Sequence, residues 1–164
     1  MTFEKLNCDN EQDIVEMSQL ATSIVREYYD PLLGTEQNDY MLDMFQSVHG
    51  IKEQLEHNCQ YYFVVDDDNN KIGFFAYYIR EDELYLSKLY LIKNQRGKGY
   101  SKAILKFLIN DAKANGKNII TLNVNKYNKS VQIYEKLGFK RIRAEVNDIG
   151  NGYYMDDFVY SYSV

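Results

Sequence analysis

Residues 84–108 read LYLSKLYLIKNQRGKGYSKAILKFL: an apolar strand, a basic turn with two glycines, and a helix with one apolar face. Gly97 and Gly99 lie where strand gives way to helix, so the first N–H groups of the helix lack intrahelical acceptors. The helix dipole adds positive potential there, and Arg96 and Lys98 add charge that suits phosphate. The turn therefore predicts an anion-binding cradle.

The leucines of the strand change phase within it. Leu84 and Leu86 follow one phase of the two-residue period, whereas Leu89 and Leu91 follow the other. The slip favours a β-bulge near residues 87–88, which would leave backbone groups unpaired and splay the strand from its neighbour. The alternative is an unbulged strand buried on both faces.

The turn resembles the cofactor motif of the GNAT superfamily of N-acetyltransferases. That motif has Arg or Gln, two residues of any kind, Gly, any residue, then Gly or Ala; this chain supplies Arg96, Gly97, Lys98, Gly99, Tyr100 and Ser101. Ser101 departs from the pattern. The resemblance implies that these six residues bind the pyrophosphate of acetyl-CoA, and that the preceding strand, with Leu89 and Leu91, pairs with the pantetheine arm.

A second segment, residues 128–139, resembles the family's second cofactor motif in its Asn, its Tyr and its final Gly-Phe, with Val131 in place of the usual Ala. The resemblance implies that Asn128 contacts the cofactor. It also implies that Tyr134 places its hydroxyl near the thioester sulfur as a general acid. Val131, Tyr134 and Leu137 share a helical face, so a core-facing aromatic is the alternative for Tyr134.

The resemblance implies an α/β fold: a mixed, mostly antiparallel sheet with a splayed parallel central pair, flanked by helices. It implies an N-acetyltransferase in which a primary amine attacks acetyl-CoA directly in a ternary complex, without a covalent acyl-enzyme and without a metal. Freed backbone N–H groups would stabilise the developing oxyanion. A cofactor-binding sensor without turnover is the alternative, and an interaction protein is a third.

The acceptor side of the site is less defined by the sequence. Glu83 and Glu27 are candidate bases, and each is also readable as a solvated surface charge. Asp156 and Asp157 form either an exposed strand edge or an acidic lip for a cationic acceptor. Four tyrosines are candidates for the wall of the acceptor pocket: Tyr28, Tyr29, Tyr85 and Tyr154.

The composition of the chain narrows the possible classes of fold, ligand and cellular location further. A chain of 164 residues favours a single domain, here residues 1–164. Its net charge of −5 argues against non-specific nucleic-acid binding and suits a small-molecule or peptide amine. No apolar run approaches a membrane span. The start MTFEKLN lacks the apolar core of a signal peptide and there are two cysteines, so we expect a cytoplasmic protein. The sequence leaves open whether the protein forms a homodimer.

Periodicity gives the remaining elements. We expect a strand over 2–8, helices over 11–29 and 38–56, strands over 61–65, 71–79 and 84–92, the cradle helix, and a strand over 118–124. Pro31 and Gly34 should end the first helix, and Gly116 the cradle helix. A short helix over 128–137 and two final strands from 139 and 153 complete the chain. Because a helix joins residues 84–92 to 118–124, those strands should be parallel.

Overall fold

The computed structural model describes residues 1–164, and it has a mixed α/β fold with a seven-stranded, mostly antiparallel sheet. The strands follow the order β1-β2-β3-β4-β5-β7-β6. Their bounds are β1 Thr2–Lys5, β2 Gln60–Val65, β3 Lys71–Ile79, β4 Leu84–Leu91, β5 Ile119–Asn125, β6 Lys140–Gly150 and β7 Tyr153–Ser163. The helices are α1 Glu11–Leu33, α2 Thr35–Phe45, α3 Val48–Glu56, the 3-10 turn η1 Lys93–Gln95, α4 Tyr100–Ala114 and α5 Ser130–Leu137.

The chain divides into two units. The first comprises residues 1–78 and 88–98, and the second residues 79–87 and 99–164. One division falls inside β4, between Ser87 and Lys88, where the sequence predicts the bulge. A second falls between Lys98 and Gly99, inside the glycine turn, and a third between Tyr78 and Ile79, at the end of β3. A single domain over residues 1–164 and the bulge itself both stay predictions.

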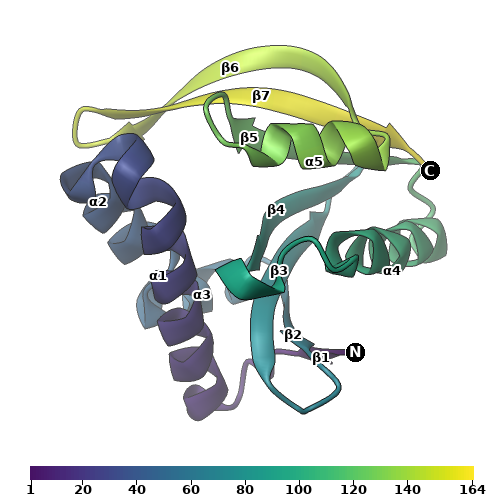
Figure 1. The fold of residues 1–164 in the computed structure, drawn as a ribbon, viewed down its shortest axis with the longest axis horizontal. Coiled ribbons are helices and arrows are strands. Elements are labelled where there is room, and N and C mark those ends of the chain that lie inside the picture. Colours follow the sequence, from purple (N-terminus) through teal and green to yellow (C-terminus); the bar gives the residue numbers. More distant parts are fainter. The chain divides into compact units, whose positions relative to one another are not determined.

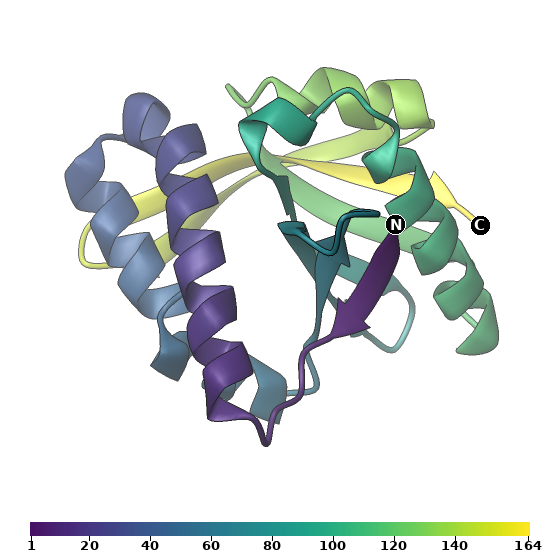
Figure 2. The same cartoon turned by 60° about the horizontal axis from the view of Figure 1, so that its bottom comes forward.

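The first unit packs three helices with β1, β2 and β3, which pair antiparallel in sequence order (Figure 2). Asn10 caps α1, since its side chain accepts hydrogen bonds from the N–H groups of Gln12 and Asp13. One face of α1 is fully buried, with Ile14 and Met17 among its residues. These side chains pack with strand residues such as Phe63 and Phe74 in one apolar cluster. The strands predicted over 61–65 and 71–79 are thus confirmed.

Two helix boundaries differ from the sequence prediction. Pro31 lies inside α1 instead of ending it, and the helix runs on until Gly34, whose N–H donates to the Asp30 carbonyl. The expected helix over 38–56 is two helices, because Ser47 adopts an extended conformation and its side chain caps α3 through the N–H of Gly50. Local capping here overrides the continuous apolar pattern.

The second unit is built around the parallel pair that the crossover predicts. Leu84, Tyr85 and Leu86 of β4 pair with Ile120, Thr121 and Leu122 of β5, and α4 connects the two strands (Figure 1). β7 pairs antiparallel with β5 and β6 antiparallel with β7. Left-handed Gly116 and Gly138 follow α4 and α5 as expected. None of the helices in either unit has the length and apolar character required to span a bilayer.

Candidate active site

The glycine turn between β4 and α4 has the geometry that an anion cradle requires. Gly97 and Gly99 have φ of +77° and +86°, a region that L side chains rarely adopt. A Cβ built on either glycine would meet no atom within 4 Å. The glycines are therefore required by backbone conformation and leave open space beside the turn, which a ligand can use.

The start of α4 is uncapped. Gly99 holds the N-cap position, no side chain accepts from the first turn, and the Gly99 carbonyl accepts the first helical hydrogen bond, from Ala103 N–H. The N–H groups of Tyr100, Ser101 and Lys102 precede that first bond and face outward from the helix end. Gly97, Lys98 and Gly99 are exposed. The helix dipole and these donors together favour an anion here.

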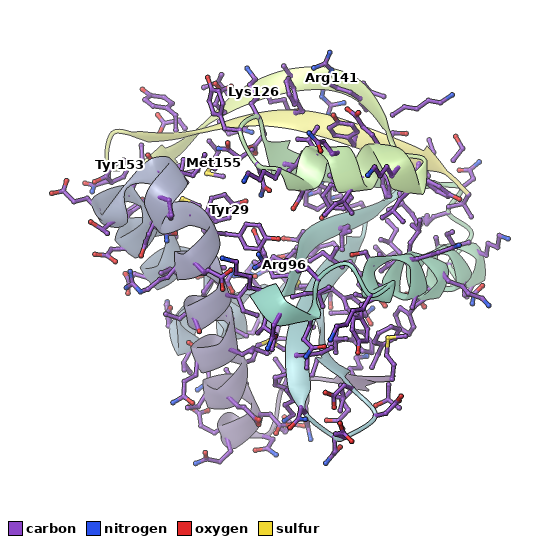
Figure 3. All side chains as sticks on the ribbon, viewed as in Figure 1. Tyr29, Arg96, Lys126, Arg141, Tyr153 and Met155 are labelled. Carbon is purple, nitrogen blue, oxygen red and sulfur yellow. The ribbon has the colours of Figure 1, made fainter.

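Arg96 is already engaged by its own unit (Figure 3). Its Nε donates to the Leu91 carbonyl at 3.1 Å, and its Nη2 lies 3.0 Å from Glu27 Oε1 on α1. The guanidinium carbon lies 4.1 Å from the centroid of the Tyr28 ring. Arg96 thus ties the end of β4 to α1, and Glu27, one of the candidate bases, is its ion-pair partner.

A pocket of about 640 Å³ lies between α4 and α5 and begins at Gly99. Three lysines are among its lining residues: Lys102 and Lys106, one turn apart on α4, and Lys136 on α5. Leu105, Leu137 and Tyr162 supply apolar surface. A positively charged groove with an apolar floor suits a phosphorylated nucleotide. Sequence reasoning missed these lysines, although the i, i+4 spacing of Lys102 and Lys106 directly after the cradle was a usable signal.

The parallel pair lies in the second unit, where Leu84, Tyr85 and Leu86 of β4 pair with Ile120, Thr121 and Leu122 of β5. The side chain of Asn123, the next residue of β5, accepts a hydrogen bond of 3.2 Å from the Tyr85 hydroxyl. The splay of this pair stays a prediction.

Asn128 lies just before α5, and Tyr134 lies within it. The Asn128 side chain, 7% exposed, accepts a hydrogen bond of 2.8 Å from Ser130 N–H and so helps to start the helix. The Tyr134 ring, 8% exposed, packs edge-on against Phe139 with centroids 5.7 Å apart. Both positions are locally well fixed, and the cofactor roles of Asn128, Tyr134, Leu89 and Leu91 stay predictions. Leu91 is buried and Leu89 is partly buried.

A second pocket, of about 230 Å³, opens on the β4-β5-β7-β6 part of the sheet. Its wall includes Glu83, which accepts 2.8 Å from the Thr121 hydroxyl and lies 3.4 Å from Arg80. It also includes Tyr85, the only one of the four tyrosines proposed for an acceptor wall that lines this pocket. Tyr154 is 55% exposed, while Tyr28 and Tyr29 belong to the first unit.

Asp157 lies at the edge of this polar network and is 5% exposed, so it is not part of an exposed strand edge. Asn123 Nδ2 contacts both Glu145 Oε2, at 3.2 Å, and Asp157 Oδ2, at 3.5 Å. Asp157 Oδ1 is buried and has no hydrogen-bond partner. Burial raises the pKa of Asp157, and Asp156 and Glu145 add to the rise. Asp156 instead pairs with Lys126 at 2.6 Å.

No metal site accompanies these pockets: the structure has no cluster of three or more His, Cys, Asp and Glu side chains placed to hold an ion. His49 is exposed and lies 4.0 Å from Glu53. The candidate site comprises the glycine turn, the lysine groove and the polar sheet pocket.

Comparison with known proteins shows which family has this fold. Residues 31–153 match the acetyltransferase (GNAT) domain, whereas curated protein sequences gave no match. Several solved structures overlap nearly the whole chain. The PaiA N-acetyltransferase of Thermoplasma acidophilum in complex with coenzyme A has 20% identity, TM-score 0.78 and full coverage of both chains. A GCN5-related N-acetyltransferase of Rhodopseudomonas palustris has 13% identity and TM-score 0.80, over 99% of this chain and 95% of that one.

A third similar structure is a point mutant of the spermidine N-acetyltransferase SpeG of Vibrio cholerae. It has 18% identity and TM-score 0.66, over 99% of this chain and 92% of that one. At these identities the likeness concerns the fold, while the domain match covers well over half of the sequence. The chain belongs to the GNAT superfamily of N-acetyltransferases.

Proposed function

We propose that this acyltransferase moves the acetyl group of acetyl-CoA to a primary amine on a small cationic molecule. The observation that carries the proposal is the continuity of the open glycine turn with the lysine groove, since Gly99 belongs to both. A diphosphate at the turn and a further phosphate in the groove would each meet donors or positive charge.

Residues 96–101 would bind the pyrophosphate, chiefly through the backbone N–H groups at the start of α4. Lys102, Lys106 and Lys136 would interact with the nucleotide part of the cofactor. By resemblance, Leu89 and Leu91 would lie along the pantetheine arm and Asn128 would contact it. When bound, acetyl-CoA supplies an activated acyl carbon, and this chain supplies its binding and orientation.

For the chemistry, we propose direct attack by a neutral amine without a covalent acyl-enzyme. Backbone N–H groups beside the end of the β4–β5 ladder would stabilise negative charge on the acetyl oxygen. Tyr134 would donate the proton that the leaving thiolate needs. Its ring is held by Phe139, so its hydroxyl has a fixed position relative to α5.

Carboxylates in the polar sheet pocket and beside it support a cationic acceptor; Glu145 lines the pocket, and Asp157 lies next to its Asn123. Asp157 places a buried carboxylate oxygen without a partner beside Glu145 and Asn123. An ammonium group would satisfy that oxygen and relieve the repulsion between the carboxylates. A spermidine N-acetyltransferase of similar fold supports a polyamine as the acceptor.

We also propose that the protein works in a reducing compartment such as the cytoplasm. Cys8 is exposed and Cys59 is buried, and both are free thiols. An exposed free cysteine is typical of proteins that do not meet an oxidising environment.

The test combines binding with turnover. Calorimetry should show that coenzyme A binds the wild type, and that Lys102→Ala/Lys106→Ala weakens binding about tenfold, because two positive charges leave the groove. Lys113→Ala/Lys117→Ala, which removes the same charge further along α4 and beyond it, is the control. Thiol release from acetyl-CoA is then measured with polyamines, aminoglycosides, amino acids and peptide N-termini. Binding without turnover on any amine would identify a sensor, and absence of binding would refute both readings.

A further inference from the structure

β6 is the terminal strand of the sheet and pairs only with β7 (Figure 1). It has 11 residues, about twice the usual length of a strand. Residues 140–144 and 146–148 are all exposed. A long exposed edge presents a row of unsatisfied N–H and C=O groups, so it is a template for another strand.

The side chains of β6 add apolar surface to this edge. Ile142 is 51% exposed and Val146 is 64% exposed, although both are β-branched residues that prefer packed strands. A strand laid along β6 would cover both.

The charges along β6 identify the strand that fits. Basic residues precede Ala144, at Lys140, Arg141 and Arg143, and acidic residues follow it, at Glu145 and Asp148. An identical strand laid antiparallel about Ala144 would place Arg143 opposite Glu145, two residues on the same face of the sheet. The same two-fold arrangement places Ile142 opposite Val146. A parallel, in-register copy would instead set each charge against its own kind, which is unfavourable.

The backbone is suited to this arrangement at its centre. The β6–β7 ladder shifts register between Arg141 and Arg143 and is then regular from Arg143 to Asp148. Arg143 Nε already donates to Glu145 Oε1 at 2.7 Å within the chain. A second copy would therefore place two arginines and two glutamates in alternation on one face of the joined sheets. Figure 3 shows Arg141 on the outer part of this hairpin.

We infer that two copies of this protein associate through antiparallel pairing of β6 with β6, about a two-fold axis at Ala144. The pairing joins two sheets into one and is isologous, as a two-fold dimer requires. One strand pair buries less surface than a permanent dimer does, so the dimer should dissociate on dilution.

Charge-swapped variants test the pairing. Lys140→Glu/Arg143→Glu makes the charges of β6 largely acidic, and Glu145→Lys/Asp148→Lys makes them basic. Sedimentation is measured for each variant, for their mixture and for the wild type, over about a hundredfold range of concentration. We expect the wild type to form a dimer at the upper end, each variant to stay monomeric, and the mixture to form a 1:1 heterodimer. The control, Lys5→Glu/Lys113→Glu, makes the same charge change away from β6 and should dimerise.

Hydrogen exchange of the wild type is an independent measurement that needs no variant. Amides of residues 140–148 should become more protected as concentration rises, while those of α4 should not. A wild type that stays monomeric, a dimer that survives in the acidic variant, or a dimer without added protection in β6 would each overturn the inference. Circular dichroism of each variant confirms that a monomer is a folded one.

Discussion

Lys88 donates a hydrogen bond of 2.8 Å from its ammonium to the hydroxyl of Tyr61. Its second partner is the side-chain carbonyl of Gln54, so both groups that receive the charge are neutral. Burial lowers the pKa of Lys88 to about 8 from 10.5, and Cys59 opposes the shift. The first unit therefore holds a partly buried ammonium group whose hydrogen-bond partners carry no charge.

Because of this arrangement, the free energy of unfolding should change with pH in the alkaline range. Between pH 8 and 10.5 the unfolded chain binds the Lys88 proton and the folded chain has lost it, so the free energy of unfolding rises with pH. The expected gain is about 2 kcal/mol between pH 8 and pH 10, relative to Lys88→Met, which cannot titrate. Urea unfolding of both proteins at the two pH values measures it. Identical pH slopes would show that Lys88 is solvated.

Gly99→Ala tests the cradle against a matched glycine. Both Gly99 and Gly116 have positive φ and open space around a built Cβ, so alanine at either should cost about 1–2 kcal/mol of stability. Only Gly99 lies where we propose phosphate binds. Coenzyme A affinity should fall about tenfold in Gly99→Ala, because the methyl group obstructs the anion, and should be unchanged in Gly116→Ala. Calorimetry at equal salt concentration measures both affinities. An equal loss of coenzyme A affinity in the two variants would contradict phosphate binding at the glycine turn.

Tyr134→Phe removes one hydroxyl and keeps the ring against Phe139. If the hydroxyl protonates the leaving thiolate, kcat should fall about a hundredfold while KM for acetyl-CoA changes little. The melting temperature should stay within a few degrees of the wild type, which separates chemistry from folding. Steady-state thiol release measures the rates, and a kcat equal to wild type would assign Tyr134 to the core alone.

Asp157→Asn removes the buried charge and keeps the shape of the side chain. We expect KM for a polyamine acceptor to rise about tenfold, because the ammonium loses a charged partner in a poorly solvated site. Asp156→Asn is the control, since Asp156 already pairs with Lys126. Equal effects of the two substitutions on KM would indicate general attraction at the surface and not a specific contact.

Several features were readable from the sequence because they depend on neighbours in the chain. The two-residue period over 84–91, the two glycines before α4 and the crossover to residue 118 predict strand, cradle, helix and parallel strand without tertiary information. Left-handed Gly116 and Gly138 end their helices for the same local reason. The prediction that Pro31 ends α1 was wrong. The last turn of α1 tolerates a missing N–H group because its other hydrogen bonds continue to Gly34.

The sequence by itself determined the order of elements, the glycine turn and the family motifs, since these follow from periodicity and backbone preference over a few residues. Only the tertiary structure decided which charged side chains form ion pairs, which are buried and which line the groove. It engaged Arg96 with Glu27, buried Asp157, and brought Lys136 to the same groove as Lys102 and Lys106, about thirty residues earlier. Burial and ion pairing depend on chain segments that meet only after folding, and no local pattern records them.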